Sequence, residues 1–291
     1  MQHCDVFVEN FKVGDMARYG LDAPSLLALN PRLVYCSVTG FGQTGPYSDR
    51  AGYDYAVQGM GGLMSVTGER DDLPGGGPQK VGVAVTDLFT GMYATVGILA
   101  AVRHAEATGE GQHIDMALMD VATSVMSNQA QNYLTSGIAP KKMGNAHPNL
   151  VPYAVFDCAD GWIILATGND TQYQRLCEIL GLHDLAHAPQ FATNADRVAN
   201  RADLTQRLTA ATRGFAKADL LAACEAQGVP AGPINDLAET FADPQVVARQ
   251  MEIAPEGIKG VRSPFRFSGA DLALDRPAPK LGQHQDEILG K

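Results

Sequence analysis

The chain has 291 residues, and its 45% of hydrophobic and 19% of charged residues are typical of an ordinary soluble globular protein. Its 22 basic and 32 acidic residues leave a net charge of −10, which disfavours nucleic acid and anionic membranes as partners. An anionic small molecule is not excluded, because its binding depends on a local pocket and not on the net charge. The length predicts one large domain or two ordinary ones.

Cysteine usage and the first residues bear on cellular location. The five cysteines are widely spaced and include no CxxC pair, which favours a reducing compartment over a disulfide framework or a zinc site. The opening MQHCDVFVEN has no basic region followed by an apolar block, so no signal peptide is expected. The apolar run Leu88–Val102 is short for a membrane span, and we interpret it as a core helix. We therefore expect a cytoplasmic protein.

The first half of the chain predicts short apolar strands that alternate with helices, the pattern of a parallel α/β sheet. The acidic, Gly- and Pro-rich stretch Glu69–Pro78 predicts a surface loop. The helix from Leu88 is expected to end before Gly109, because glycine commonly follows a helix. The predicted strands are Asp5–Glu9, Leu33–Val38, Val81–Val85 and His113–Leu118, and the predicted helices are Ala23–Leu29, Tyr53–Met64, Leu88–Val102 and Met119–Leu134.

After Pro152 the pattern changes to a smaller α+β organisation. Two predicted strands, Tyr153–Asp157 and Trp162–Ala166, are joined by a turn. The polar segment Thr193–Arg197 is interpreted as part of a link between helices. The predicted helices are Thr171–Leu180, Ala199–Thr212 and Lys217–Gln227.

One aspartate stands where the predicted strand Val81–Val85 gives way to the long apolar helix. Asp87, in KVGVAVTDLFTG, lies near the positive end of the helix dipole in mainly apolar surroundings. Aspartate is favoured as a helix N-cap, a role that contributes about 1 kcal/mol. A carboxylate in such a place can also act as a nucleophile. The spacing alone leaves both roles open.

Other polar motifs give weaker indications. The glycine-rich pieces Gly59–Gly62 and Gly75–Pro78 do not follow a phosphate-binding pattern, so no nucleotide site is expected. His113 and Asp115 share one face of a predicted strand but have no further ligands, so no metal is expected. His147, in the polar turn GNAHPN, is a candidate for ligand contact or for ordinary turn chemistry.

Several motifs occur together in an order that resembles class III coenzyme A transferases, of the formyl-CoA transferase and carnitine-CoA transferase type. The resemblance covers essentially the whole chain. It is carried by VENFKVG around Asn10, NPRLVYCSVTGFGQTGPY at Asn30–Tyr47, AGYD at Ala51–Asp54, KVGVAVTDLFTG around Asp87, TGEGQHIDMALMD at Thr108–Asp120, GNAHPN at Gly144–Asn149, GVPAGPIND at Gly228–Asp236 and the tail LGQHQDEIL at Leu281–Leu289.

The resemblance implies an enzyme that moves CoA from an acyl-CoA to a free carboxylic acid, with Asp87 as the nucleophile. In this mechanism the carboxylate forms a mixed anhydride with the acyl group and then a thioester with CoA. An acyl-CoA and a carboxylic acid are the expected partners. CoA is a substrate, and no resident cofactor or metal is expected.

The family fold gives the expected architecture. Residues 1–150 are expected to form a Rossmann-like large domain that lacks its N-terminal part, and residues 151–255 a small α+β domain. Residues 256–291 are expected to return to the large domain and to end in a short helix. An interlocked homodimer is also implied.

Further site residues carry over by position. Asn10, Phe11, Arg18 and Tyr19 match positions that contact CoA, and Tyr53 and Asp54 match residues near the acyl group. The family's basic CoA-contacting residue falls on Ala51, which has Arg50 beside it.

The turn GNAHPN replaces the glycine-rich active-site loop of formyl-CoA transferase. It looks more like relatives that act on succinyl-CoA and dicarboxylic acids. Gly144, Asn145 and His147 are therefore expected to bind the substrate, with Asn145 and His147 as hydrogen-bond donors to an acceptor carboxylate.

Two alternative functions are kept. The same fold includes acyl-CoA racemases, whose catalytic histidine falls on Tyr53 here, and a tyrosine with its ordinary pKa of about 10 is a poor base at neutral pH. The chain could also be an inactive remnant that binds acyl-CoA. Family members carry a further segment before the motif Val8–Phe11, so we expect unpaired strand edges, exposed apolar surface and poor solubility or weak CoA binding.

Overall fold

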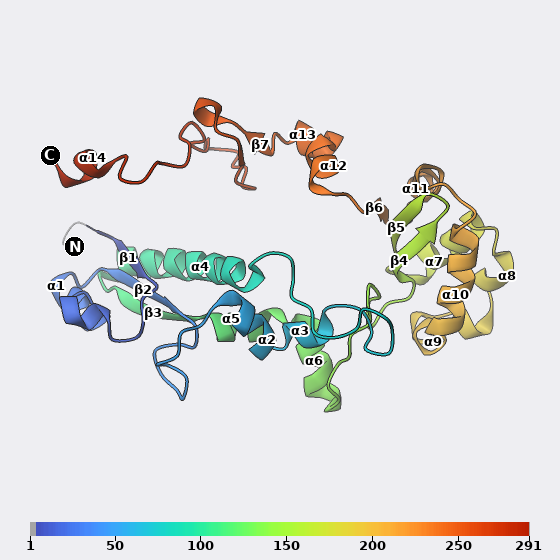
Figure 1. The fold of residues 1–291 in the computed structure, drawn as a ribbon, viewed down its shortest axis with the longest axis horizontal. Helices are drawn as coiled ribbons and strands as arrows, with labels where there is room; N and C mark the ends of the chain where they lie inside the picture. Colours follow the sequence, from blue (N-terminus) through green and yellow to red (C-terminus); the bar gives the residue numbers. More distant parts are fainter. Residues whose placement is uncertain (1–3, 291) are drawn as a thin grey trace. The chain divides into compact units, whose positions relative to one another are not determined.

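The structure is a computed structural model that describes residues 4–290 (Figure 1). The chain divides into two compact units, the first ending at Asn149 and the second beginning at Leu150. The first unit contains a three-stranded parallel sheet and the second a three-stranded antiparallel sheet, each accompanied by helices. The expected mixed α/β class is confirmed at this level.

The elements of the first unit follow the predicted order closely. Helix α1 has the predicted bounds, and each of the three sheet strands lies within one residue of its prediction at either end. The elements are β1 Val6–Glu9, a 3-10 helix at Met16–Tyr19, α1 Ala23–Leu29, β2 Val34–Thr39, α2 Asp54–Met60, α3 Leu63–Val66, α4 Val85–Thr108, β3 Gln112–Ala117, α5 Leu118–Val125 and α6 Ser127–Ser136.

Strand β2 lies at the centre of the parallel sheet, between β1 and β3. Val6 pairs with Val34, and Val34 with Gln112, so the three strands run in the same direction. Their carboxyl ends therefore meet at one edge, where Glu9, Thr39 and Ala117 are the last strand residues. This edge is the place where open parallel sheets bind ligands.

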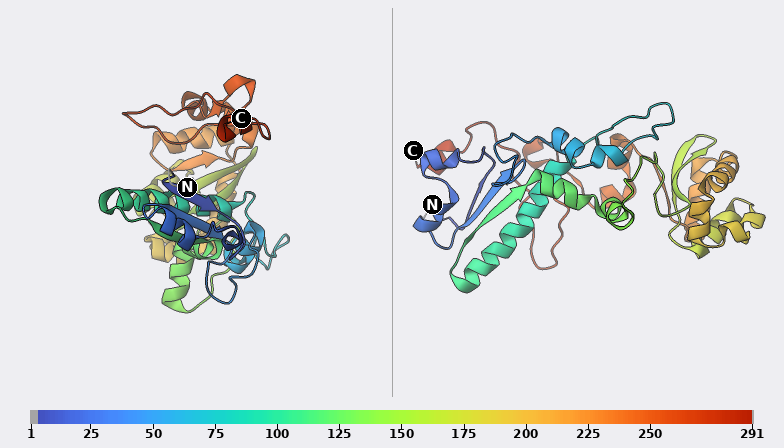
Figure 2. Two further views of the ribbon diagram at one scale, coloured as in Figure 1. Left: turned by 90° about the vertical axis from the view of Figure 1, so that its left-hand side faces the viewer. Right: turned by 90° about the horizontal axis from the view of Figure 1, so that it is seen from below.

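Helix α4 packs against β2 and β3 and lies beside the sheet in the right-hand view of Figure 2. It ends at Gly109, which adopts the left-handed conformation expected at a C-cap. Small residues face inward, and the large apolar side chains Leu88, Val96 and Leu99 are 61%, 62% and 65% exposed. The expectation of a core helix is therefore wrong, because an all-round apolar helix has here only one covered face.

Within residues 4–290, α4 is also the one helix long and apolar enough to cross a membrane, judged by length and composition. One such helix is weak evidence for a membrane span, since helices of soluble proteins pass the same test. The helix carries Asp87 in its first turn.

The predicted strand Val81–Val85 does not form. The Val81 N–H donates to Gln58 Oε1 at 3.0 Å, and α4 has already begun at Val85. A side chain of α2 takes the place of a neighbouring strand, so the alternating valines line an irregular segment. Two predicted helices are each broken: Tyr53–Met64 at Gly62, and Met119–Leu134 at Ser127, where φ becomes positive.

The second unit opens with a hairpin. Strands β4 and β5 pair antiparallel, and the short β6 joins β5. The elements are β4 Tyr153–Cys158, β5 Gly161–Ala166, α7 Asp170–Ile179, α8 His183–Ala186, a 3-10 helix at Pro189–Phe191, α9 Asn194–Ala199, α10 Arg201–Thr212, α11 Lys217–Ala226, β6 Ala231–Pro233, α12 Leu237–Ala242, α13 Pro244–Ala248, β7 Glu252–Ile253, a 3-10 helix at Pro255–Gly257, β8 Gly260–Val261 and α14 Gln285–Leu289.

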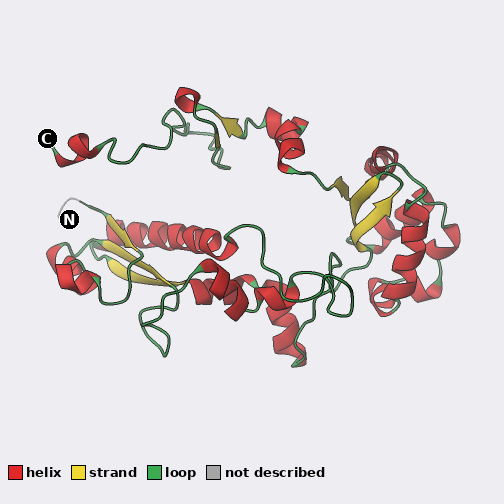
Figure 3. Ribbon diagram, viewed as in Figure 1, coloured by secondary structure: helices red, strands yellow, loops and turns green. Residues whose placement is uncertain are grey.

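The chain between β8 and α14 is largely loop, as Figure 3 shows. It contains no helix or strand from 262 to 284, and α14 is the short last helix that the sequence predicts.

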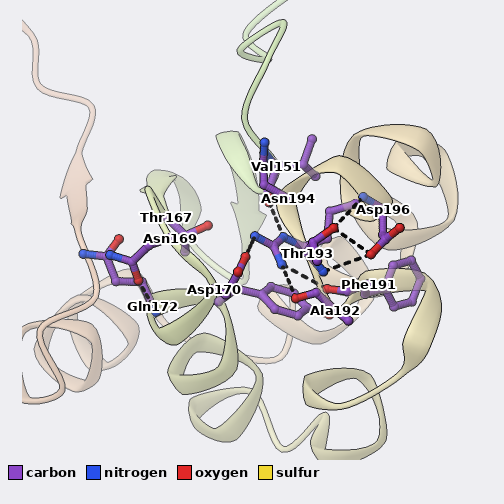
Figure 4. A network of polar contacts seen from close by, with 12 residues as sticks. Val151, Thr167, Asn169, Asp170, Gln172, Phe191, Ala192, Thr193, Asn194 and Asp196 are labelled. Carbon is purple, nitrogen blue, oxygen red and sulfur yellow. Dashed lines mark hydrogen bonds and ion pairs between the residues drawn. The ribbon is translucent and has the colours of Figure 1, made fainter.

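A network of polar contacts that includes Val151, Asp170 and Phe191 lies at the start of the second unit (Figure 4). Arg197 is 1% exposed, and its guanidinium donates to the carbonyl oxygens of Val151 at 2.7 Å and Phe191 at 3.0 Å. It also pairs with Asp170 Oδ1 at 2.7 Å and lies over the Tyr173 ring, 4.5 Å from its centroid. Each hydrogen-bonding partner is thus close to ideal distance.

The segment Thr193–Arg197 is consequently not a plain link. Thr193 and Asp196 form a reciprocal capping box at the start of α9. Asn194 Oδ1 accepts the Val151 N–H at 3.1 Å. The segment is therefore also hydrogen-bonded to the chain just before β4. Polarity in this segment therefore reflects a hydrogen-bond network that includes one buried side chain, Arg197.

Replacing Arg197 by Met is expected to lower the free energy of unfolding by about 3 kcal/mol, since it leaves buried carbonyl oxygens without donors. The exposed pair Arg207–Asp203 offers a matched control, and Arg207→Met should cost about 0.5 kcal/mol or less. Urea denaturation of both variants checks this, and equal losses would contradict the assigned role of Arg197.

Candidate active site

A pocket of about 550 Å³ lies at the carboxyl edge of the parallel sheet. Its wall combines the segments that follow β1, β2 and β3 with the first turns of α4. The lining residues are Asn10, Phe11, Lys12, Val13, Val38, Thr39, Gly40, Ser48, Arg50, Ala51, Gly52, Tyr53, Asp54, Asp87, Thr90, Gly91 and Leu118.

Two glycines allow the backbone to close around the end of β2. A Cβ added to Gly40 would lie 2.4 Å from the Cα of Gly52, and the reverse substitution meets the same obstacle. Only residues without a side chain permit this approach. It carries the following residues Tyr53 and Asp54 onto the wall of the pocket.

Asp87 does not cap α4. The N-cap position is Ala84, and Asp87 lies three residues later in the first turn. The orphan N–H of Thr86 is satisfied by Asp54 Oδ1, from α2, at 2.8 Å. The structural alternative for Asp87 is therefore wrong, because another aspartate fills the capping role.

The Asp54 carboxylate is held on both oxygens. Its Oδ2 accepts the Gln58 side-chain amide at 2.7 Å, one helical turn further along α2. Gln58 is fully buried. Asp54 thus faces the pocket, while its hydrogen-bonding capacity serves the start of α4.

The surroundings of Asp87 make ionisation of its carboxyl less favourable than it is in water. Partial burial raises the pKa of Asp87, and the negative charge of Asp54 raises the pKa further. The Asp87 carboxyl itself remains exposed to the pocket. It is therefore a less well solvated, more basic carboxylate than one on an open surface.

The β1 side of the pocket is shaped by a buried carboxylate. Glu9, the last residue of β1, is 9% exposed, and its Oε2 accepts the Phe11 N–H at 2.8 Å. This bond fixes the turn that places Asn10 and Phe11 on the pocket wall.

Two cations line the same pocket. The Arg50 guanidinium lies over the Tyr47 ring, 4.0 Å from its centroid, and Tyr47 in turn packs edge-on against Phe41. Within residues 4–290, neither Arg50 nor Lys12 forms an ion pair with a carboxylate. Both can therefore accept an anionic group of a ligand.

Arg18 and Tyr19 do not line this pocket. They lie on the 3-10 helix Met16–Tyr19, where Arg18 pairs with Asp15 at 3.3 Å and Tyr19 is 75% exposed.

The turn with Gly144, Asn145 and His147 is also outside the pocket lining. The Gly144 N–H donates to the Gly68 carbonyl at 3.1 Å, and a buried Lys142 pairs with Asp71 at 2.5 Å. His147 Nδ1 accepts the Asn149 N–H at 3.1 Å. These contacts tie the turn to the loop at 68–77, while Asn145 stays exposed.

Sequence reasoning missed two contributors to the site. Thr90 lies one turn after Asp87 on the pocket side of α4, and Gln58 lies four residues after Asp54. Both spacings place side chains on one helix face, so helical periodicity could have indicated them.

His113 and Asp115 make hydrogen bonds within the protein, His113 to the Ser37 side chain and Asp115 to the Gln43 N–H. The described part of the chain has no cluster of three His, Cys, Asp or Glu residues that could hold a metal ion.

The chain is similar in sequence to known proteins. The family described as CoA-transferase family III matches residues 1–285. The succinate–glutarate CoA-transferase of Agrobacterium fabrum is 54% identical over 99% of this chain, which spans 72% of that relative. The succinyl-CoA:glutarate CoA-transferase of Homo sapiens is 39% identical over 98% of this chain, which spans 66% of that relative.

A crystal structure of a CaiB/BaiF family protein from Brucella suis superposes with a TM-score of 0.85 at 53% identity. The match covers 99% of this chain and 75% of that structure. The expected enzyme class, a class III CoA transferase, is confirmed by the family match and by these relatives. This chain belongs to CoA-transferase family III.

Proposed function

We propose that this protein transfers CoA from succinyl-CoA to a dicarboxylic acid, with Asp87 as the covalent carrier. One observation carries the role of Asp87: its carboxylate faces a pocket of about 550 Å³ while a different aspartate caps its helix. The substrates are supported by the names of the relatives, which pair succinate or succinyl-CoA with glutarate.

The first half of the reaction moves CoA from the donor acid onto Asp87. A carboxylate oxygen attacks the thioester carbonyl carbon, the carbon–sulfur bond breaks and CoA leaves as the thiolate, giving a mixed anhydride. The thiolate then attacks the aspartyl carbonyl carbon and releases the donor acid as a carboxylate. The product is an aspartyl-CoA thioester, so the energy of the original thioester is kept.

The second half repeats these steps with the acceptor acid. Its carboxylate attacks the aspartyl thioester, the thiolate leaves, and the anhydride so formed is attacked by the thiolate at the acceptor carbonyl. The free Asp87 carboxylate is regenerated. The raised pKa of Asp87 accompanies a more nucleophilic carboxylate, because basicity and nucleophilicity rise together within one class of oxygen nucleophiles.

The pocket cations serve the anionic substrates in this proposal. Arg50 and Lys12 line the pocket, and each can bind the phosphates of CoA or the second carboxylate of the acid. Asn10, Phe11 and Tyr53 provide further contacts from the wall. Arg18, Tyr19 and the turn with Asn145 and His147 stay proposals for contacts at the edge of a bound acyl-CoA.

The remaining expectations are kept as proposals. They are a Rossmann-like arrangement of the large domain, a returning C-terminal segment, a homodimer, a cytoplasmic location and the need for no resident cofactor. A racemase is disfavoured by one specific observation. Such a reaction needs a second acid–base group opposite Asp87, and the pocket lining contributed by residues 4–290 includes Tyr53 but no histidine.

Asp87→Asn is expected to lower the transfer rate about a thousandfold or more, because an amide cannot form the anhydride. The measurement is formation of glutaryl-CoA from succinyl-CoA and glutarate. Mass spectrometry of the wild type with succinyl-CoA should show a CoA adduct on Asp87. Transfer by the Asn variant at the wild-type rate would refute the covalent role.

Asp87→Asn is also expected to raise the free energy of unfolding at neutral pH. Folding raises the pKa of Asp87, so the protonated carboxyl stabilises the folded state. That contribution is fully present below the unfolded-state pKa of about 3.9 and is lost as the pH rises through the higher folded-state pKa. Urea unfolding from about pH 4 to about pH 7 should show an advantage of the variant that grows with pH. An advantage that shrinks with pH would be inconsistent with this.

Arg50→Met is expected to raise the KM for succinyl-CoA or for the acceptor acid about tenfold, the effect of losing about 1.4 kcal/mol of anion binding. Arg103→Met is the matched control, because Arg103 lies on α4 away from the pocket lining. Unchanged KM values for both substrates in Arg50→Met would remove this residue from the proposed site.

A further inference from the structure

Gln58 is a buried polar residue that the proposed mechanism does not use. It is 0% exposed, lies on the inner face of α2 and does not line the pocket. A buried side-chain amide must satisfy both its donor and its acceptor groups. Its partners therefore show what its presence in the fold achieves.

The Gln58 amide connects three separate places. Its Nε2 donates to Asp54 Oδ2 at 2.7 Å and lies 3.5 Å from the Val83 carbonyl oxygen. Its Oε1 accepts the Val81 N–H at 3.0 Å. The amide is thus hydrogen-bonded to the irregular segment before α4 and also to the Asp54 carboxylate, which accepts the Thr86 N–H at the start of α4.

The chain of contacts continues to Asp87. Asp54, oriented by Gln58, accepts the Thr86 N–H with its other oxygen at 2.8 Å. Thr86 directly precedes Asp87 and is itself 1% exposed. The first turn of α4 is therefore fixed from α2 at two points, one before the helix and one within it.

We propose that Gln58 is a positioning residue for the transferase reaction, which sets the start of α4 and thereby the direction of the Asp87 carboxylate. This inference rests on the proposed role of Asp87. An attack on a thioester needs the carboxylate aligned with the carbonyl carbon, and a displacement of about 1 Å can cost a hundredfold in rate. A primary amide is the side chain that donates to Asp54 and accepts from Val81 at once.

The test replaces Gln58 by Met, which keeps length and removes both hydrogen-bonding groups. Amide hydrogen exchange at Val81 and Thr86 is expected to become about tenfold faster, since their acceptors are lost or released. The kcat for transfer from succinyl-CoA to glutarate should fall about tenfold to a hundredfold, with the KM for succinyl-CoA within about twofold, because Gln58 does not touch the pocket.

The matched control is Gln131→Met. Gln131 is exposed on α6, where its amide donates to Thr135 Oγ1 at 2.9 Å. This variant should leave the exchange at Val81 and Thr86, and both kinetic constants, as in the wild type. It separates the general effect of a Gln→Met substitution from the loss of the hydrogen bonds that Gln58 makes.

Gln58→Glu is the second variant, and it decides the case if the Met variant does not fold. The new carboxyl keeps an acceptor for the Val81 N–H, but beside Asp54 it shares one proton with that residue at low pH and has no donor for Asp54 only at high pH, where both carboxyls are ionised. Relative to the wild type at the same pH, exchange at Thr86 should therefore rise at high pH while exchange at Val81 stays protected, and kcat should fall there as well. A purely structural role predicts the same difference between the two amides but an unchanged kcat.

The outcomes are distinct. Unchanged exchange at Thr86 in both variants overturns the positioning role, whatever the kinetics. Faster exchange with an unchanged kcat also overturns it, because the start of α4 would then not matter for the reaction. Absence of transfer by the wild type refutes the proposed function instead, and the exchange data still report whether Gln58 holds the helix start.

Discussion

The start of α4 depends on one carboxylate, Asp54, which accepts hydrogen bonds from the Thr86 N–H and from the Gln58 amide. A helix leaves its first backbone N–H groups without partners. The N-cap residue Ala84 has only a methyl side chain, which cannot accept a hydrogen bond from them. The partner therefore comes from another helix, which couples α4 to α2. Burial raises the pKa of Asp87, and the negative charge of Asp54 raises it further. Asp54 thus contributes both to the position and to the electrostatics of the proposed nucleophile.

The parallel sheet explains why distant motifs reach one pocket. Strands that run in the same direction deliver the residues that follow them to the same edge, so Asn10 after β1 and Leu118 after β3 line one wall. The segment after β2 turns back over this edge. The turn is tight because Gly40 and Gly52 have no side chains to keep their backbones apart. In the motif AGYD, Gly52 is the residue whose backbone contacts that of Gly40. The next two residues, Tyr53 and Asp54, line the pocket.

Much of this could be predicted from the sequence. Alternation of apolar strands and helices is a local pattern, so the strands of the parallel sheet and α1 were located to within a residue or two. What failed depends on tertiary contacts. The valines of Val81–Val85 have strand-like alternation, but a strand needs a neighbour, and here the Gln58 side chain takes that place. The exposure of Leu99 on α4 is likewise decided by what packs against the helix, and composition alone does not reveal that. The burial of Arg197 could not be predicted from its polar segment, because its partners Val151 and Phe191 lie outside that segment.

The ambiguity between cap and nucleophile at Asp87 also has a physical resolution. A carboxylate that caps a helix accepts backbone N–H groups, and those bonds lower its basicity and occupy the lone pairs that a nucleophile needs. One residue would perform both roles poorly. In the proposed function the two roles belong to two aspartates on two helices. Asp54 has both oxygens engaged and half-buried surroundings, whereas Asp87 stands in the first turn with its carboxylate open to the pocket. Burial and the nearby Asp54 charge both destabilise the ionised Asp87 in the folded state, and the same two effects make the Asp87 carboxylate more basic.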